Sequence, residues 1–256
     1  MPGLRWSACC WRSPRRVRCA CWWPEALRLD SSLHLYYGGT FDPVHNGHLA
    51  IACSARDELR CTVRLMPAAD PPHRAPPGAD AGQRVHMLEL AVAGEPGLVV
   101  DPRELQREGR SYSIDTLRQL RAELGPEAPV ALLIGADSYL GLPTWHQWRD
   151  LFGLAHFVVA PRPGSAVGGQ AGEAGPAPEL AAVSAGRWSA SAAELERLPA
   201  GRLFLLDPPL RPESASEVRG RIAAGRPWKS LVPPAVAAYI VSHGLYAGLA
   251  PGRSPL

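Results

Sequence analysis

Two histidines close to two glycines are the residues of this chain best suited to chemistry. In the stretch GGTFDPVHNGH, Gly38 and Gly39 precede a Thr-Phe-Asp-Pro turn, and His45 and His48 follow it. Glycine lets the backbone approach a ligand closely, while imidazole donates hydrogen bonds to phosphate and can gain charge as the anion does. Residues spaced three apart share one helix face, so both histidines can face the same anion. The stretch therefore favours phosphate binding.

Two other interpretations stay open from the residues alone. The stretch can be a purely structural junction between a strand and a helix, or its histidines can belong to a metal site, although no third ligand lies nearby in the sequence. Two common phosphate-binding loops are excluded. A Walker loop needs a lysine after its last glycine, whereas Lys229, the only lysine, follows Trp228. The G-x-G-x-x-G dinucleotide motif is also missing.

The elements that must position this stretch alternate along the chain. Apolar segments predict strands at residues 33–39, 61–67, 98–102, 130–136, 156–164 and 202–210. Amphipathic segments predict helices at 46–59, 81–93, 113–124, 214–225 and 233–245, with Ser113 as the N-cap of the third. This alternation predicts an α/β fold with a Rossmann-like parallel sheet and helices on both faces. Ligands bind such sheets beyond the carboxyl ends of the strands, where GGTFDPVHNGH lies.

One folded domain is expected, at residues 32–248, followed by a tail at 249–256. Residues 1–31 are expected to be a disordered or mis-annotated extension that the fold does not need. Their first 24 residues hold five arginines and no acid but show little amphipathic period. Residues 164–200 are rich in Gly, Ala and Pro, which predicts a variable surface excursion with a short helix at 191–198.

Composition excludes several classes of function. No apolar run is long enough to cross a bilayer, so an integral membrane protein is not expected. The net charge of +3 comes from scattered arginines, which argues against a nucleic-acid partner. Four of the six cysteines fall within the first 23 residues, and only Cys53 and Cys61 remain. A disulfide framework is therefore not expected in the domain, which favours a reducing, cytoplasmic setting.

The stretch GGTFDPVHNGH resembles the signature of the nucleotidylyltransferase superfamily. Later segments are similar, in matching order, to those of bacterial nicotinate-nucleotide adenylyltransferases: PPHR, SYSIDTL, IGADS, PTWHQW, VVAPRPG, SASEVR and LVPPAVAAYI…GLY. The resemblance implies a nucleotidylyltransferase domain in which the phosphate of nicotinic acid mononucleotide attacks the α-phosphorus of ATP and releases pyrophosphate. Such a transfer depends on alignment and charge neutralisation more than on covalent catalysis.

The resemblance implies an ATP site built from three segments. His45 and His48 would contact the ATP phosphates and stabilise the transition state, and Arg219 would join them as a catalytic residue by holding the β- and γ-phosphates. The ATP-binding residues implied in this way are Gly38, Gly39, Thr40, Gly135, Asp137, Ser216 and Arg219. From the residues alone, SASEVR can equally be a capped helix with a surface arginine, and Asp137 can cap the helix that follows IGADS.

The resemblance also implies a site for the pyridine nucleotide. Trp145 of PTWHQW would stack on the nicotinate ring, although a tryptophan is more often a core residue. Backbone amides around Tyr112 and Ser113 would receive the carboxylate of that ring. His73 and Arg74 of PPHR would reach its phosphate.

Two departures from the family pattern concern these sites. Ala215 stands where the family often has a serine or threonine, so this chain offers no hydroxyl there. Ala68 and Ala69 stand where some relatives carry asparagines, which leaves only backbone for a polar substrate contact.

The partners implied by the resemblance are ATP and nicotinic acid mononucleotide, with Mg²⁺ carried by ATP and without dedicated protein ligands. Nucleic acid and membrane are not expected as partners, and the oligomeric state is left open. The alternatives are another small-substrate enzyme, such as a phosphopantetheine or nicotinamide mononucleotide adenylyltransferase, and a nucleotide sensor without turnover. A phosphopantetheine adenylyltransferase or a glycerol-phosphate cytidylyltransferase tends to be shorter and to lack SYSIDTL and PTWHQW in this order, whereas both segments are present here.

Overall fold

A six-stranded parallel sheet organises the chain. The computed structural model describes residues 29–69, 78–107, 111–161, 167, 175–209 and 211–247. The strands lie in the order β3-β2-β1-β4-β5-β6. Their bounds are β1 (His34–Gly39), β2 (Val63–Pro67), β3 (Leu98–Val100), β4 (Val130–Gly135), β5 (His156–Ala160) and β6 (Leu203–Leu205). The predicted Rossmann-like α/β fold is confirmed, with each predicted strand present.

Helices connect the strands in nearly every crossover. The α-helices are α1 (Asn46–Leu59), α2 (Ala81–Val92), α3 (Ser113–Leu124), α4 (Ala136–Leu140), α5 (Trp148–Leu154), α6 (Pro178–Ser184), α7 (Ala193–Arg197), α8 (Ala215–Ala223) and α9 (Pro234–Ser242). Three short 3-10 turns accompany them: η1 (Arg103–Gln106), η2 (Leu142–Thr144) and η3 (Lys229–Leu231). Within these described ranges, no helix is long and apolar enough to span a membrane.

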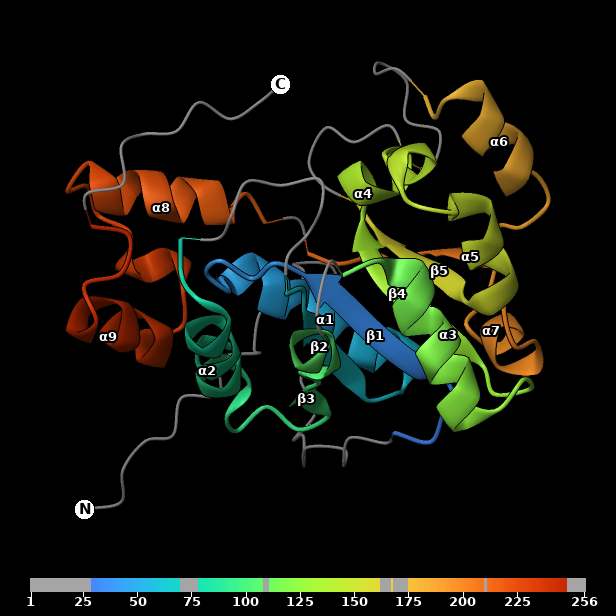
Figure 1. Cartoon of the computed structure of the whole chain (residues 1–256), viewed down its shortest axis with the longest axis horizontal. Helices are drawn as coiled ribbons and strands as arrows, with labels where there is room; N and C mark the ends of the chain where they lie inside the picture. The colour runs from blue at the N-terminus through green and yellow to red at the C-terminus, as the bar shows by residue number, and fades with distance from the viewer. Residues whose placement is uncertain are drawn as a thin grey trace, which may run out of the picture.

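The sheet is buried on both faces, and residues alternate between two cores. On β1, Leu35 and Tyr37 pack against α1, α2, α8 and α9, whereas Tyr36 faces the opposite core. On β4, Leu133 joins the first core and Leu132 the second, which holds α3, α4, α5 and α6. Figure 1 shows the result, with α2, α8 and α9 at one end of the molecule and α3 to α6 at the other. The continuous apolar run VALLIG is what a central parallel strand requires.

The strand order places a topological switch point between β1 and β4. From β1 the chain continues to β2 on one side of that strand. The later strand β4 lies on the other side of β1, and β5 follows beyond it. Ligands of open α/β sheets bind at such a point, beyond the carboxyl ends of the strands. Here those ends are Gly39 and Gly135, so both predicted glycine segments lie at the expected edge.

Residues 175–200 contribute buried side chains to both cores. Leu180 of α6 is fully buried in the core that holds α3 to α5, and Leu195 of α7 is fully buried in the other. Ser184 lies 2.8 Å from the hydroxyl of Tyr139, and the ring of Trp188 meets that of Tyr139 edge-on at 5.6 Å. The helix α6 was not predicted, because its short Ala-rich segment lacks a clear amphipathic period.

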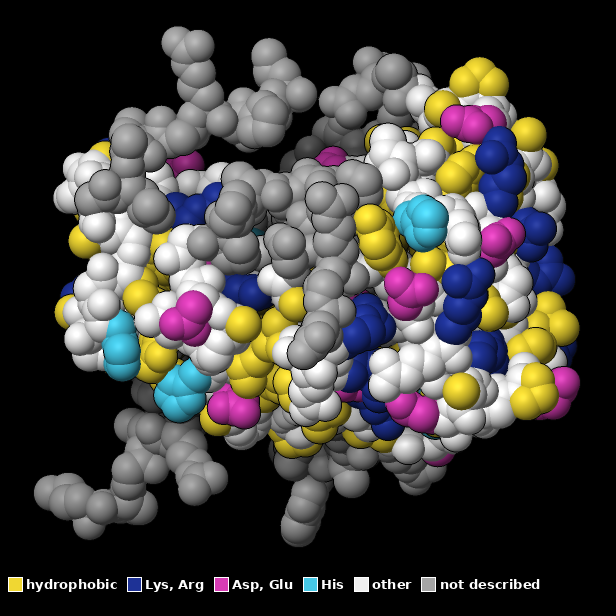
Figure 2. All heavy atoms as spheres, viewed as in Figure 1, with side chains coloured by type: hydrophobic (Ala, Val, Ile, Leu, Met, Phe, Trp, Pro, Cys, Tyr) yellow, Lys and Arg dark blue, Asp and Glu magenta, His cyan; other side chains and the backbone are white. Residues whose placement is uncertain are grey.

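Arginine side chains are frequent on the face of the molecule shown in Figure 2. In Figure 2 their side chains gather over the half of the molecule that carries α3 and α5, with acidic side chains between them. Several are tied to a partner within the protein: Arg103 to Asp101 at 2.8 Å, and Arg149 to Glu179 at 2.9 Å.

A buried neutral histidine lies at the end of the sheet where the strands begin, opposite their carboxyl ends. His156, at the start of β5, lies with Nε2 2.8 Å from the carbonyl oxygen of Leu198, and its Nδ1 accepts the N–H of Arg202 at 3.0 Å. A ring that accepts at Nδ1 donates at Nε2, which is the neutral form. Burial lowers the pKa of His156 from its usual 6.5. The unfolded chain therefore binds more protons than the folded one below about pH 6.5.

We expect His156 to make the fold sensitive to acid. Its contribution is present above about pH 6.5 and is lost as the pH falls below that value. Thermal unfolding of the wild type and of His156→Gln, measured at about pH 7.5 and about pH 5.5, tests this. The wild type should lose more stability on acidification than the variant. An equal loss in both proteins would contradict the assignment.

Candidate active site

The histidines of the H-x-G-H segment cap the helix that they begin. His45 is the N-cap of α1, and its Nδ1 accepts the backbone N–H of His48 at 3.3 Å. In return, Nδ1 of His48 accepts the backbone N–H of His45 at 3.3 Å. This reciprocal capping box satisfies two donors that a helix start leaves without intrahelical partners. Because both Nδ1 atoms are acceptors, the proton of each neutral ring sits on Nε2.

Packing fixes the direction of both imidazole rings. They stack on each other with centroids 3.7 Å apart and an angle of 27° between the planes. The ring of His48 also meets the edges of Phe41 and Tyr37, at centroid distances of 5.0 and 6.1 Å. His45 is buried and His48 half-buried. The two Nε2–H groups are therefore preorganised, as donors to a developing negative charge must be.

The surroundings of the three glycines of the motif explain the absence of a side chain in different ways. A Cβ on Gly47 would lie 3.0 Å from Nδ1 of His45, so this glycine leaves room for the histidine ring. A Cβ on Gly39 would lie 3.0 Å from the ring of Phe41, so its role is also internal packing. A Cβ on Gly38 would meet nothing within 4 Å. Of the two predicted backbone contacts to a ligand, only Gly38 opens onto unfilled space.

A buried carboxylate ties the turn to distant parts of the chain. Asp42 is 4% exposed and accepts the backbone N–H groups of Gly78 at 2.7 Å and Ala79 at 3.1 Å. The hydroxyl of Tyr246 donates to it at 2.7 Å. Arg219 reaches the same residue, with Nη1 donating to its carbonyl and lying 3.7 Å from its carboxylate. Burial beside this carboxylate raises the pKa of Tyr246, which keeps its proton on the donor oxygen.

Asp42 thereby brings α8 to the histidines. Ser214 is the N-cap of α8 and accepts the N–H of Glu217 at 3.1 Å, while Ser216 Oγ lies 3.4 Å from Nη2 of Arg219. A small cleft of about 20 Å³ lies between the start of α1 and the segment before α8. Its lining consists of His45, Gly47, His48, Ile51, Pro161, Pro208, Pro209, Arg211 and Glu213. The start of α1 and Arg211 offer phosphate donors to this cleft, while Ser216 and Arg219 do not line it and are linked to the turn before α1 through Asp42.

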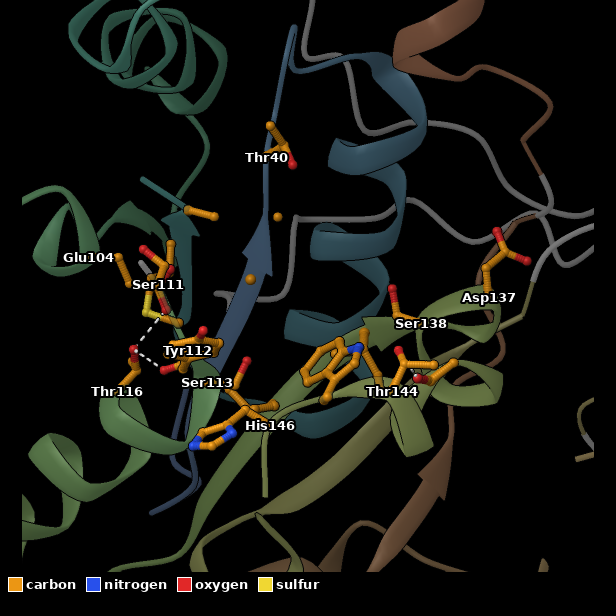
Figure 3. A pocket seen from close by; sticks show the side chains of 18 residues that line it. Thr40, Glu104, Ser111, Tyr112, Ser113, Thr116, Asp137, Ser138, Thr144 and His146 are labelled. Atoms are coloured by element: carbon orange, nitrogen blue, oxygen red, sulfur yellow. Dashed lines mark hydrogen bonds between the residues drawn. The ribbon is translucent and has the colours of Figure 1, made fainter. Parts of the chain in front are cut away.

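A larger pocket of about 290 Å³ opens on the other side of Gly38 and Gly39. One wall is the start of α3, with Tyr112 and Ser113, and the opposite wall runs from α4 through η2 to Trp145. Figure 3 shows these two walls facing each other, with Thr40 at the end of β1. Trp145 is half-buried and partly packed on the core, so one part of its ring is structural. The remaining lining combines an apolar floor with hydroxyl groups, which suits a small aromatic ligand with polar substituents.

The start of α3 carries no side-chain cap. Its N-cap is Tyr112 rather than the predicted Ser113, which is already the first helical residue. That prediction was wrong because the carbonyl of Tyr112 accepts the N–H groups of Asp115 and Thr116, at 3.1 and 3.3 Å, and the serine lies one position too late. The N–H groups of Ser113 and Ile114 have no intrahelical acceptor at such a position. Ser113 lines the pocket, so this 12-residue helix begins beside it, and the helix dipole favours an anion there.

Comparison with known proteins agrees with this geometry. The cytidylyltransferase-like family model matches residues 36–221, which is more than half of the chain. The chain belongs to this family. A "probable nicotinate-nucleotide adenylyltransferase" from Stenotrophomonas maltophilia (strain K279a) is 60% identical over 225 residues, which cover 86% of this chain and 99% of that relative. One of the same name from Xylella fastidiosa (strain 9a5c) is 48% identical, over 84% of this chain and 96% of its own length.

Solved structures share the fold at much lower identity. Nicotinic acid mononucleotide adenylyltransferase from Plasmodium falciparum, complexed with NaAD, superposes with a TM-score of 0.60 at 15% identity. The match covers 84% of this chain and 97% of that one. The same protein complexed with APC gives a TM-score of 0.58. The resemblance to nicotinate-nucleotide adenylyltransferases is thus confirmed by sequence, and the nucleotidylyltransferase fold by structure.

The structure groups the predicted family residues into two adjoining sites. The large pocket receives Gly38, Gly39, Thr40, Tyr112, Ser113, Asp137 and Trp145. The histidine side receives His45 and His48, with Ser216 and Arg219 joined to it through Asp42. Gly135 is the N-cap of α4, so the alternative in which Asp137 caps that helix is wrong. His73 and Arg74 lie outside the described residues.

Six polar residues that line the large pocket were not predicted: Glu104, Ser111, Thr116, Ser138, Thr144 and His146. His146 is exposed and its ring lies 4.9 Å from that of Tyr112. It follows Trp145 directly, and this adjacency was the available signal. Glu104 is buried in η1, a turn that no periodicity marks, so the sequence gives no comparable sign of it.

We expect the Tyr246 hydroxyl to stabilise the fold through Asp42. Tyr246→Phe removes one donor from a buried carboxylate, which should lower the free energy of unfolding by about 1–3 kcal/mol. Chemical denaturation of both proteins measures this. Tyr239→Phe is a matched control, because the Tyr239 ring packs between His86 and His243 on the surface of α9, and it should change stability by less than about 0.5 kcal/mol. Equal losses in the two variants would contradict the role given to Asp42.

Proposed function

We propose that this chain transfers the adenylyl group of ATP to nicotinic acid mononucleotide, giving nicotinic acid adenine dinucleotide and pyrophosphate. The observation that carries the proposal is the junction of two sites at the end of β1. Gly38, Gly39 and Thr40 line the large pocket, and the same turn leads directly to the paired imidazoles. An aromatic ligand in the pocket and a polyphosphate at the histidines would meet beside this turn. The name that the high-identity relatives carry supports the assignment.

On the ATP side, the proposed ligands are donors and cations. The Nε2–H groups of His45 and His48 would donate to oxygens of the α-phosphate region. Arg219, with Ser216 beside it, would hold the β- and γ-phosphates; its guanidinium is one-third exposed and already fixed at one end by Asp42. Gly135 and Asp137, at the start of α4, would meet the adenosine. Ala215 is the first residue of α8, so the hydroxyl contact common in the family is replaced by backbone there.

On the pyridine side, the proposed contacts combine stacking with backbone donors. Trp145 would stack on the nicotinate ring. The N–H groups at the start of α3, beside Tyr112 and Ser113, would receive its carboxylate. His73 and Arg74, which follow β2 in the sequence, are proposed to reach the phosphate of the mononucleotide.

The chemistry then needs no protein nucleophile. An oxygen of the mononucleotide phosphate attacks the α-phosphorus of ATP, a new P–O–P bond forms, and the bond to pyrophosphate breaks on the opposite side. Holding both phosphates in line supplies most of the acceleration, and the histidine donors stabilise the charge that builds up on the α-phosphate. ATP would enter with Mg²⁺ bound to its phosphates. Over the described ranges, no group of three His, Cys, Asp or Glu side chains could hold a metal ion.

We place this reaction in the cytoplasm, without nucleic acid or membrane as a partner. The two cysteines of the domain, Cys53 and Cys61, are buried free thiols, which suits a reducing compartment. Burial raises the pKa of Cys61 to about 12, so it stays protonated and inert.

The substrate prediction concerns the acid and amide forms of the mononucleotide. N–H groups at the start of α3 suit a carboxylate, whereas an amide turns its own NH₂ donor toward them. We therefore expect a higher kcat/KM with nicotinic acid mononucleotide than with the amide, measured as pyrophosphate release with ATP and Mg²⁺. Trp145→Ala should weaken both substrates by about 1–3 kcal/mol, as loss of stacking does. Equal efficiencies would refute the substrate assignment, and turnover of pantetheine phosphate alone would favour a different enzyme of the family.

The catalytic prediction uses the double role of His48. His48→Ala should lower kcat by about two to four orders of magnitude, because one preorganised donor contributes on the order of 3–5 kcal/mol. It also removes the acceptor for the His45 N–H, so folding must be controlled separately. His48→Gln places a capping-box acceptor at the same helix position but no imidazole. We expect His48→Gln to unfold near the wild-type temperature and yet to be as slow as His48→Ala. Near-normal turnover in His48→Gln would reduce the segment to a structural junction.

A further inference from the structure

A buried carboxylate lines the large pocket without a place in the proposed chemistry. Glu104, in the short turn η1, is 6% exposed. Its Oε1 accepts the hydroxyl of Thr116 at 2.7 Å, and the hydroxyl of Ser111 also bonds to its side chain. Thr116 is 1% exposed and lies in the first turn of α3. Figure 3 shows these three side chains together on one wall of the pocket.

The charge of Glu104 is compensated from outside the pocket. Arg107 donates through Nη2 to the Thr116 hydroxyl at 3.0 Å, so its cation lies one group away from the carboxylate. Asp101 adds a repulsive charge from the end of β3. Burial raises the pKa of Glu104 above its usual value, against the hydrogen bonds from Thr116 and Ser111 and the nearby Arg107. The carboxylate is thus held by hydrogen bonds to residues of the same pocket wall.

The same network joins two walls of the pocket. The hydroxyl of Ser111 accepts the N–H of Ala69, the second residue after β2, at 3.2 Å. The carbonyl of Ala69 is held in turn by the guanidinium of Arg84 at 3.2 Å, which also binds the carbonyls of Thr40 and Ala68. Glu104 therefore connects the start of α3 with the carboxyl ends of β1 and β2.

This connection matters because the helix start has no side-chain cap of its own. Tyr112 makes no side-chain cap, so the direction of the first N–H groups of α3 depends on how its first turn is held. Thr116 lies in that turn, and its own N–H bonds to the carbonyl of Tyr112 at 3.3 Å. The hydrogen bond from the Thr116 hydroxyl to Glu104 therefore helps to fix the orientation of the first turn, including the residues that face the pocket.

We infer that Glu104 and Thr116 are positioning residues for the pyridine mononucleotide, and that they hold the N–H groups at the start of α3 in line with its carboxylate. This inference rests on the proposed function. Neither side chain needs to touch the substrate, since both act through Tyr112 and Ser113. Their loss should affect the pyridine substrate and leave ATP, which binds around the paired histidines, unaffected.

The test first removes the hydrogen bond between Thr116 and Glu104 at the Thr116 end, while the size of that side chain is kept. Thr116→Val replaces the hydroxyl by a methyl group of equal size, and Thr116→Ser restores the hydroxyl. We expect Thr116→Val to raise KM for nicotinic acid mononucleotide about tenfold, which corresponds to one hydrogen bond, with KM for ATP within about twofold of wild type. Thr116→Ser should return KM close to wild type. The acid-over-amide preference should fall in Thr116→Val and recover in Thr116→Ser.

A double-mutant cycle with Glu104→Ala sharpens the result. Glu104→Ala removes the same bond from the other side, so the double variant should be no weaker than the worse single one. His156→Gln is the control for general loss of stability, because it disturbs a buried polar group at the opposite edge of the sheet. It should leave the ratio of the two KM values unchanged.

The outcomes separate the inference from the proposed function. Equal rises of both KM values in Thr116→Val, matched by His156→Gln, would mean a purely structural role. An unchanged KM for the mononucleotide, or additive effects of the two substitutions, would overturn the inference while the reaction itself stands. Failure of the wild type to release pyrophosphate with ATP and nicotinic acid mononucleotide would refute the proposed function directly.

Discussion

A single buried carboxylate holds the turn between β1 and α1 in place. The Asp42 carboxylate receives donors from the backbone after β2 and from the last described turn of the chain, and Arg219 of α8 donates to its carbonyl, so segments up to 204 residues apart meet at one residue. A buried charge is tolerated only when it is fully hydrogen-bonded, which makes all three approaches mutually dependent. The positions of the histidines and of Arg219 follow from this constraint, because the turn that carries Asp42 begins α1.

Most of the fold could be predicted from periodicity. The helices over 46–59 and 113–124 begin and end as predicted, because their apolar residues recur with helical spacing and glycine or arginine follows them. Strand ends were predicted too long at 156–164 and 202–210, where Pro161 and Pro208 cannot join a ladder. The helix α6 escaped prediction, since its burial depends on Tyr139 and on neighbours far along the chain.

The site was predictable where chemistry is concentrated in a short motif. His45, His48 and Trp145 lie in compact segments whose residue types carry a meaning of their own. Glu104 and Thr116 acquire their relation only when η1 folds against α3. Neither residue stands out in composition, and a buried glutamate is unusual only once its burial is known. Contacts of this kind depend on tertiary packing, which no local pattern encodes.

The reciprocal cap between the two histidines alters the usual relation between activity and robustness. In many enzymes the reactive groups destabilise the fold, and replacing them gives a more stable but inactive protein. Here each imidazole accepts a backbone N–H at the start of α1, so the groups assigned to the reaction also stabilise the fold. Under the proposed function, most substitutions at these two positions would therefore remove activity and stability together, so a lineage that lost the activity would gain little stability by discarding the imidazoles.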